Sequence, residues 1–67
     1  MRKAVINVKE LRERLAMSQP EFALAFGFNL GTLRQWERGR RHPDEAARSL
    51  LTVILHSPEI VKAALSA

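Results

Sequence analysis

Apolar residues recur at intervals of three and four positions along most of the chain, the spacing that places side chains on one face of an α-helix. Residues that favour helix starts and helix ends interrupt this pattern at several points. Only Ala4-Val5-Ile6 has an extended pattern, and it is too short for more than an arm or an edge strand. The pattern therefore predicts an all-α fold with five helices, at about residues 8–16, 19–26, 30–38, 44–56 and 58–66.

The first three predicted helices begin at recognisable capping residues. Asn7 with Glu10, and Ser18 with Glu21, are each a side-chain acceptor followed three residues later by an acid. Pro20 lies in the first turn of the second helix, where its missing N–H removes no helical hydrogen bond. Asn29 can cap the third helix. These signals predict three short helices in close succession.

Glycine and proline mark the remaining boundaries. Gly27 is the expected left-handed end of the second helix, and Gly39 is expected to close the third. Pro43-Asp44-Glu45 and Ser57-Pro58-Glu59 open the last two helices, because Ser caps and Pro and Glu favour a first turn. The chain shows neither a linker nor an internal repeat. We expect an N-terminal arm at residues 1–7 and one domain at residues 8–66, with its C-terminal helices at about 44–66.

The central segment, about residues 18–38, has the layout of a helix-turn-helix: a short helix, a turn with glycine and a second helix. Ala23 is small where two helices would cross closely, and Gly27 can supply a positive φ at the turn. A generic small helical bundle with the same punctuation is the alternative interpretation. In the helix-turn-helix, the expected core residues are Phe22, Phe26, Leu33 and Trp36.

Composition narrows the classes of protein and partner. With 67 residues and no cysteine, the chain has neither disulfides nor thiolate metal sites and fits a reducing compartment. Eleven Lys and Arg against seven Asp and Glu give a net charge of +4, which favours a polyanionic partner such as nucleic acid or a membrane surface. No apolar run approaches the roughly 18 residues of a membrane span, and the N-terminus lacks the apolar stretch of a signal peptide. We expect a cytoplasmic protein with no membrane partner.

Catalytic and metal sites are not expected. Ser18 and Ser57 are better explained as helix caps than as nucleophiles. His42 and His56 lie fourteen positions apart, and no nucleophile-elbow or metalloprotease motif accompanies them. We therefore predict a protein that is not an enzyme and that has no catalytic residues, metal ligands or cofactor.

The central segment resembles the phage-repressor family of helix-turn-helix proteins, the XRE or Cro/C1 type. The similarity runs through Met17 to Ala23, Phe26-Gly27 and Thr32 to Pro43. Its most specific element is the phrase W-E-x-G-x-R-x-P, which begins here at Trp36 and ends at Pro43. The tail, residues 46–61, resembles more narrowly the HigA-like antitoxins. The resemblance implies a compact five-helix, lambda-repressor-like fold and a bacterial or phage regulator, associated with the nucleoid, that binds an operator in double-stranded DNA.

In such a protein the third helix enters the major groove, where base edges present a unique pattern of donors and acceptors. Arg34 can fork onto guanine and Gln35 onto adenine. Leu30 can touch a thymine methyl, and Gly31 lets the backbone approach the bases closely. The alternatives are a solvated surface arginine at position 34 and a core leucine at position 30. The expected base-reading residues are Leu30, Gly31, Arg34 and Gln35.

Contacts to the DNA backbone are expected from helix N-termini and basic side chains. Family resemblance makes Gln19 a phosphate clamp. Four arginines and one glutamate give residues 34–41 a net charge of +3, beside the helix that enters the groove. The expected backbone contacts are Gln19, Asn29, Thr32, Arg38, Arg40 and Arg41. The resemblance also pairs Glu37 with Arg12 as a partly buried, structural ion pair.

The last two helices are apolar on more than one side, which favours burial against both the domain core and a second subunit. A homodimer would place two third helices about 34–36 Å apart and would require a palindromic operator. The alternative is a monomer in which the fifth helix folds over the fourth. The expected dimer interface comprises Val53, Ile54, Ile60, Val61, Ala64 and Leu65.

A protein-interaction module is the rival function. HigA-like antitoxins also bind and inhibit a cognate toxin that cleaves RNA, so the resemblance implies a toxin protein as a further partner. The candidate contact is Arg2-Lys3-Ala4-Val5-Ile6, which can add a strand to the edge of a partner sheet. A frayed, basic tail is the alternative for this segment, and toxin binding and DNA binding can coexist.

Overall fold

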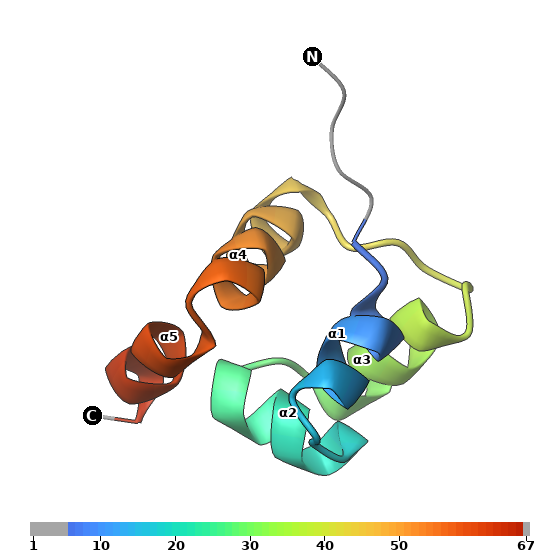
Figure 1. Cartoon of the computed structure of the whole chain (residues 1–67). Coiled ribbons are helices and arrows are strands. Elements are labelled where there is room, and N and C mark those ends of the chain that lie inside the picture. The colour runs from blue at the N-terminus through green and yellow to red at the C-terminus, as the bar shows by residue number, and fades with distance from the viewer. Residues whose placement is uncertain (1–5, 67) are drawn as a thin grey trace.

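The computed structural model describes residues 6–66, and these form five α-helices in one continuous arrangement (Figure 1). The helices are α1 (Val8–Arg14), α2 (Gln19–Phe26), α3 (Leu30–Glu37), α4 (Glu45–His56) and α5 (Pro58–Leu65). Helices α1, α2 and α3 lie together on one side, and α4 and α5 pack against each other on the other side (Figure 1). The all-α, five-helix prediction is confirmed. The proposed strand-forming segment, Arg2 to Ile6, lies outside the described residues except for Ile6.

The first helix is shorter than predicted. Asn7 caps it through Oδ1, which accepts from the backbone N–H of Glu10 at 2.9 Å. The helix ends at Arg14 because Ala16 adopts a left-handed conformation, with φ of 57°. The Met17 N–H then donates to the Arg12 carbonyl at 3.3 Å, which closes the end of the helix. A left-handed alanine gives no composition signal, so the sequence places this end two residues too late.

Helices α2 and α3 have the predicted caps. Ser18 and Glu21 form a reciprocal capping box, and the Asn29 Oδ1 accepts from the Thr32 N–H at 3.0 Å. Gly27 and Gly39 are left-handed, with φ of 74° and 76°. Because Gly27 ends α2 abruptly, only Phe28 and Asn29 remain between it and α3. This tight turn fixes the angle between the two helices.

Helices α4 and α5 differ at their starts. The Asp44 Oδ1 accepts from the Ala47 N–H at 2.8 Å, so α4 begins one residue later than predicted. Ser57 is the N-cap residue of α5, as predicted, but its side chain makes no capping hydrogen bond. The reason is that Ser57 also ends α4: its N–H donates to the Val53 carbonyl at 2.8 Å, and its backbone is not in the usual capping conformation. Ser66 follows the last helix rather than belonging to it.

The core is entirely apolar among the described residues. Helix α2 is its centre, because it packs against both α3 and α5. Phe22 contacts Phe26 and Phe28 at ring-centroid distances of 4.9 and 5.9 Å, and Phe28 meets the edge of Trp36 at 5.2 Å. Such aromatic pairs add about 0.5–1.5 kcal/mol each beyond the area they bury. The buried residues are Val8, Leu11, Phe22, Ala23, Phe26, Leu33, Leu51, Ile54 and Val61.

None of the helices formed by residues 6–66 is long and apolar enough to cross a membrane.

Candidate nucleic-acid interface

One face of α3 is turned outward and carries polar and cationic residues. Gly31, Arg34, Gln35 and Arg38, which caps the helix, are all exposed, and their spacing of three, four and seven positions places them on one side of the helix. The opposite side is anchored by Leu33, which is fully buried, with Trp36 packed against the core. The structure therefore brings three of the four expected base-reading residues onto one accessible surface.

Leu30 and Thr32 lie at the edge of this face. Leu30 is half-buried and packs against the core, so of its two alternatives the structure shows the core contact. Thr32 is half-buried, and its N–H is engaged by the Asn29 cap. Gly31 has a role that the sequence did not reveal, since a Cβ at this position would lie 3.1 Å from the Asn29 Oδ1. The glycine thus leaves room for the capping side chain of Asn29.

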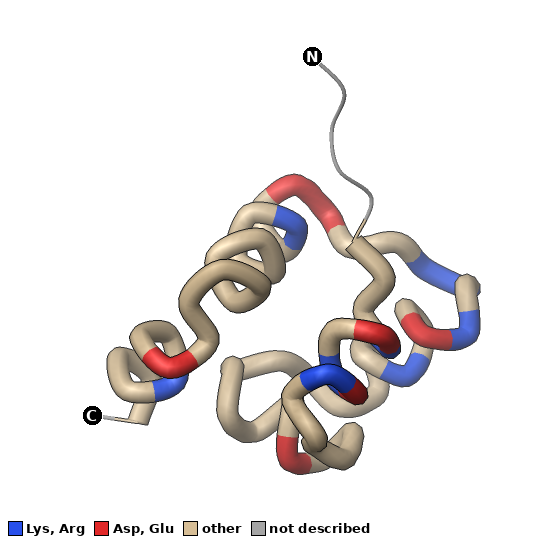
Figure 2. The backbone as a smooth tube through the Cα atoms, viewed as in Figure 1, with Lys and Arg blue, Asp and Glu red and all other residues tan. Residues whose placement is uncertain are grey.

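Positive charge gathers beside the outward face. The arginines at positions 34, 38, 40 and 41 are all exposed, along the end of α3 and the segment that follows it (Figure 2). Glu37 is turned inward, and only 5% of its side chain is exposed. Removing this one negative charge from the surface makes the outer face more positive than the net +3 counted from the sequence. We call the exposed residues Arg34, Arg38, Arg40 and Arg41 the arginine patch.

Arg12 and Glu37 form a two-pronged ion pair across α1 and α3. The Arg12 Nε lies 2.8 Å from the Glu37 Oε2, and the Arg12 Nη2 lies 2.9 Å from the Glu37 Oε1. The hydrogen bonds from Arg12 lower the pKa of Glu37 below its usual value, although burial opposes the shift. The same hydrogen bonds raise the pKa of Arg12. Both groups are therefore charged at neutral pH, and the pair expected from family resemblance is present.

The pair also holds the connection between α1 and α2. The Arg12 Nη1 donates to the carbonyl of Met17 at 2.9 Å, just after the left-handed Ala16. With 13% of its side chain exposed, Arg12 thus ties its own helix to α3 and to the start of the helix-turn-helix. Two-pronged geometry and partial burial make this pair stronger than an ordinary surface ion pair.

Gln19, the first residue of α2, lies between Glu37 and Arg34. Its Nε2 donates to the Glu37 Oε1 at 3.1 Å, and its Oε1 accepts from the Arg34 Nε at 3.2 Å. Sequence analysis expected Gln19 at a phosphate and did not predict either contact. The available signal was the spacing of Arg34 and Glu37 by three positions on α3, which places both on the side that faces the start of α2.

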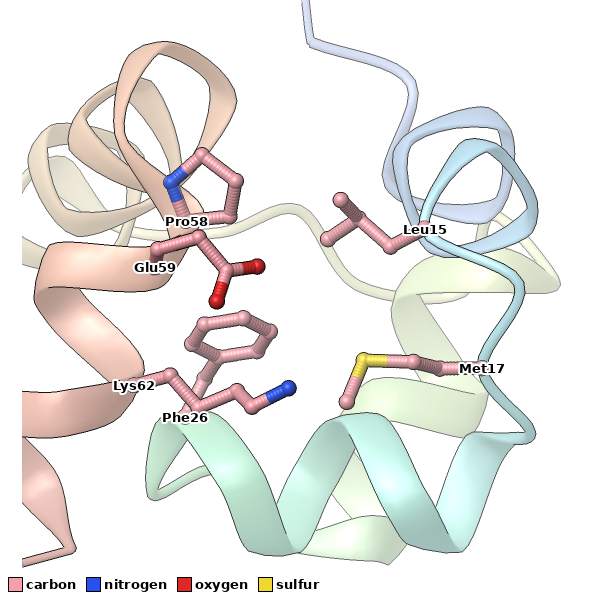
Figure 3. Close-up of a pocket in the computed structure, with 6 residues that line it drawn as sticks. All are labelled: Leu15, Met17, Phe26, Pro58, Glu59 and Lys62. Atoms are coloured by element: carbon pink, nitrogen blue, oxygen red, sulfur yellow. The ribbon is translucent and has the colours of Figure 1, made fainter.

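Two hollows lie among the described residues, and only the larger one is lined by residues of α3. An open groove of about 350 Å³ lies between the start of α1 and the end of α3, and its polar lining includes Lys9, Arg38 and His42. A smaller cavity of about 60 Å³ lies between Met17, Phe26 and α5, with Glu59 and Lys62 on its far side (Figure 3). The smaller cavity is well below the roughly 300–1,000 Å³ typical of small-molecule sites. Within residues 6–66 no three His, Cys, Asp or Glu side chains gather as a metal site.

The expected dimer interface is only partly accessible. Ile54 is fully buried and Val61 is 8% exposed, and both belong to the core of the single chain. These two residues therefore cannot face a second subunit, because their sides of α4 and α5 are already covered by the rest of the domain. The predicted dimer interface also did not include Leu55, which is partly exposed. We call the exposed residues Val53, Leu55, Ile60, Ala64 and Leu65 the C-terminal apolar surface.

Comparison with known proteins places this geometry among helix-turn-helix proteins. A helix-turn-helix family model matches residues 8–47, which cover α1 to α3 and the start of α4. The crystal structure of an XRE-family-like helix-turn-helix protein from Agrobacterium tumefaciens is similar over 91% of this chain and 98% of its own, with a TM-score of 0.87 and 43% identity.

A curated protein is similar to part of this chain and is itself much larger. The type II methyltransferase M.SsoII of Shigella sonnei is 50% identical over 43 residues, which are 60% of this chain and 11% of the methyltransferase. The match covers a small part of that enzyme, so it relates the two proteins through one module.

Proposed function

The chain belongs to the XRE family of helix-turn-helix DNA-binding regulators, and on this basis we propose that α3 enters the major groove of an operator and reads its bases. Arg34 and Gln35 are the principal readers, and Gly31 allows close approach of the backbone. Leu30 supports the helix from the core side and contributes at most its exposed edge to a thymine methyl. Each two-pronged contact to the correct base is worth about 1–3 kcal/mol of discrimination.

The observation that carries this proposal is the outward face of α3. The outward side chains of Arg34, Gln35 and Arg38 are polar or cationic, and those that hold α3 in place, Leu33 and Trp36, lie on the other side. A helix that served only to complete the core would have no reason to carry an arginine patch on its exposed side. Major-groove width admits one such helix with its side chains.

The proposed backbone contacts come from the rest of the arginine patch and from the helix starts: Arg38, Arg40, Arg41, Asn29, Thr32 and Gln19. These contacts set the position of the domain on DNA and carry no sequence information of their own. If a dimer neutralises about six phosphates, the logarithm of the binding constant falls against the logarithm of salt concentration with a slope of about −5. An affinity for DNA that does not change with salt concentration would contradict the proposed phosphate contacts of these arginines.

We further propose that two copies pair through the C-terminal apolar surface and bind a palindromic operator. Ile60 is 69% exposed, Leu65 52% and Val53 50%. Exposed apolar side chains that gather on one surface mark sites of association. Pairing about a two-fold axis would bury this surface and would present two α3 helices to successive major grooves.

The most specific form of the proposal is an autorepressing, HigA-like antitoxin, which rests on the resemblance of residues 46–61. Neutralising a cognate toxin is then the second function, and the segment that would make that contact, Arg2 to Ile6, lies outside the described residues apart from Ile6. Co-expression with the product of the adjacent gene distinguishes an antitoxin from a regulator that only binds its operator. A stable complex supports the antitoxin, whereas its absence leaves an operator-binding regulator.

Selection of bound oligonucleotides from a random pool, at two salt concentrations, tests the proposal directly. We expect enrichment of an inverted repeat with half-sites about one helical turn apart, and weaker binding at the higher salt concentration. Arg38→Ala is the backbone-contact variant, and it should weaken all sequences alike. Arg14→Ala removes an exposed arginine of α1 that does not belong to the arginine patch, and it should leave affinity nearly unchanged. A pool that returns no common sequence would contradict base reading by α3.

A further inference from the structure

Four polar side chains from three helices form one continuous hydrogen-bonded chain. It runs from Arg12 on α1 to Glu37 on α3, then to Gln19 on α2, and returns to α3 at Arg34. Its inner end is nearly closed to solvent, since Glu37 is 5% exposed, and its outer end is the exposed guanidinium of Arg34. The buried ion pair of the fold is therefore connected directly to a proposed base-reading residue.

The orientation of the Gln19 amide follows from its inner neighbour. Glu37 is a carboxylate at neutral pH and can only accept hydrogen bonds. The Nε2 group of Gln19 must therefore face Glu37, because the reverse orientation would set two oxygens against each other. With its nitrogen facing inward at 3.1 Å, the amide presents its oxygen to the Arg34 Nε at 3.2 Å. The ion pair thus determines which atom Gln19 offers to Arg34.

Because Gln19 binds only the Nε of Arg34, the two Nη groups of the guanidinium stay available for DNA. Within residues 6–66, its two Nη groups make no hydrogen bond. The O6 and N7 atoms of guanine accept a fork of two such donors. A free arginine side chain loses rotamer freedom when it docks, at a cost of about 0.5–1.5 kcal/mol, and a side chain that is already held loses less.

We propose that Gln19 is a positioning residue for base recognition: through its amide oxygen it holds Arg34 with Nη1 and Nη2 available for guanine. This inference rests on the proposed DNA-binding function and adds a specificity determinant to it. Because the residue that positions the reader lies at the start of α2, discrimination depends on the relative placement of both helices of the helix-turn-helix.

A phosphate contact by Gln19 remains compatible with this role. The Nε2 group carries two hydrogens, and Glu37 accepts only one of them. The second can donate to a phosphate. The two roles have different consequences, since a lost phosphate contact weakens binding to every sequence, whereas a lost positioning contact weakens discrimination at one base pair.

The test compares discrimination at the base pair that Arg34 reads. That base pair is first identified with Arg34→Ala in the selected half-site. Gln19→Met keeps the length of the side chain and removes both the amide oxygen and the amide nitrogen. We expect it to lower the preference for guanine at that base pair by about threefold to tenfold, with the preferences at other positions unchanged. In the Arg34→Ala background, Gln19→Met should have no further effect on that preference.

Gln35→Met is the matched control, because it is the same substitution on the exposed face of α3 without a bond to Arg34. It should change preference at a different base pair. Equal weakening of all sequences by Gln19→Met would overturn the positioning role and leave a phosphate clamp. Failure of the unmodified protein to select any sequence would instead overturn the proposed DNA-binding function, so the two failures are distinguishable.

A measurement on the unmodified protein covers the case in which Gln19→Met does not fold. The Arg34 Nε–H should exchange with solvent several times more slowly than the Nε–H of Arg38, for which no hydrogen bond is found in the described part of the chain. Nuclear magnetic resonance resolves both signals. Equal exchange rates for the two groups would contradict the proposal.

Discussion

Helices α1 to α3 and the pair α4–α5 differ in how many of their apolar side chains are buried and in how many of their polar side chains form bonds between helices. In the first region, the ion pair, Gln19 and the aromatic cluster hold three helices together, and of its large apolar side chains only Leu24 is fully in solvent, at 86% exposure. In the second, four large apolar side chains remain exposed. Neither of the two ion pairs among the described residues reaches α4 or α5.

The difference indicates a division of labour between rigidity and association. The proposed reading surface is supported from behind by a nearly buried polar network, so its geometry is set before DNA is met. The α4–α5 pair contributes Leu51, Ile54 and Val61 to the shared core and leaves the rest of its apolar surface for another molecule. Figure 2 shows the same contrast in charge, since the arginine patch lies along the end of α3 and α4–α5 carries few charged residues.

The largest expected effect comes from breaking the network of the first region. Arg12→Ala leaves the Glu37 carboxylate nearly buried without its main partner, and removing one partner of such a pair costs about 3–5 kcal/mol. A single core of this size rarely supplies more than that, so the variant should be largely unfolded at 37 °C. Circular dichroism during heating measures the loss. Arg14→Ala, which removes a 3.7 Å surface contact to Glu10, should cost less than about 0.5 kcal/mol. Equal melting temperatures for the two variants would show that the Arg12–Glu37 ion pair is not what stabilises helices α1 to α3.

Acid should remove part of the same contribution without a mutation. Because the folded state lowers the pKa of Glu37, the stabilisation is present above the usual value of 4.5 and is lost as pH falls through the lowered folded-state pKa. The loss at low pH is no larger than that caused by Arg12→Ala. The carboxyl carbon of Glu37, followed by nuclear magnetic resonance, should titrate with a midpoint below 4.5, while urea unfolding records the decline in stability. A midpoint at or above 4.5 would show that the ion pair does not favour the charged carboxylate.

Association should depend on the second region alone. Val53→Lys combined with Ile60→Lys places two charges on the C-terminal apolar surface, at side chains that are 50% and 69% exposed. We expect a dimer at low micromolar concentration to become a monomer, and affinity for a palindromic operator to fall at least about tenfold, which is about 1.4 kcal/mol. Analytical ultracentrifugation measures the first effect. Leu24→Lys, on the exposed side of α2, should leave the oligomeric state unchanged. A double variant that still sediments as a dimer would contradict pairing through α4–α5.

The smallest expected effect compares a left-handed backbone position in the first region with a helical one in the second. Ala16→Gly removes a left-handed alanine and should raise stability by about 0.5–1 kcal/mol. Ala63→Gly makes the same chemical change inside α5, where the backbone is helical, and should lower stability by about 0.5–1 kcal/mol. Thermal unfolding of the two variants should thus shift in opposite directions. Shifts of the same sign would show that composition, rather than backbone conformation, decides the outcome.

Much of the fold was predictable because its signals are local. Capping residues such as Ser18 and Asn29 act through their own helix, and left-handed glycines such as Gly27 act through their own backbone. The predicted helix starts therefore agree with the structure to within one residue. The differences arose at two residues whose behaviour the sequence does not signal: the left-handed Ala16 ends α1 early, and Ser57 both ends α4 and precedes α5 without a side-chain cap.

The candidate site shows the same boundary between local and distant effects. The outward position of Arg34 and Gln35 follows from helical spacing, and the inward position of Leu33 follows from the same rule. Periodicity does not separate Ile54 and Val61, which are buried, from Val53 and Ile60, which are exposed, because α4 and α5 are apolar on more than one side. The contact from Gln19 to Arg34 joins residues fifteen positions apart and depends on the angle between two helices.

By itself, the order of amino acids determined the number and type of helices, the tight turn between α2 and α3, and the excess of positive charge near residues 34–41. Each of these follows from interactions within a few residues, or from simple addition of charges. Only the tertiary structure decided that Glu37 turns inward to Arg12, that Gln19 links this pair to Arg34, and which side of α4 and α5 stays uncovered. Those outcomes depend on how separate helices pack, because packing alone brings distant polar groups within hydrogen-bonding distance.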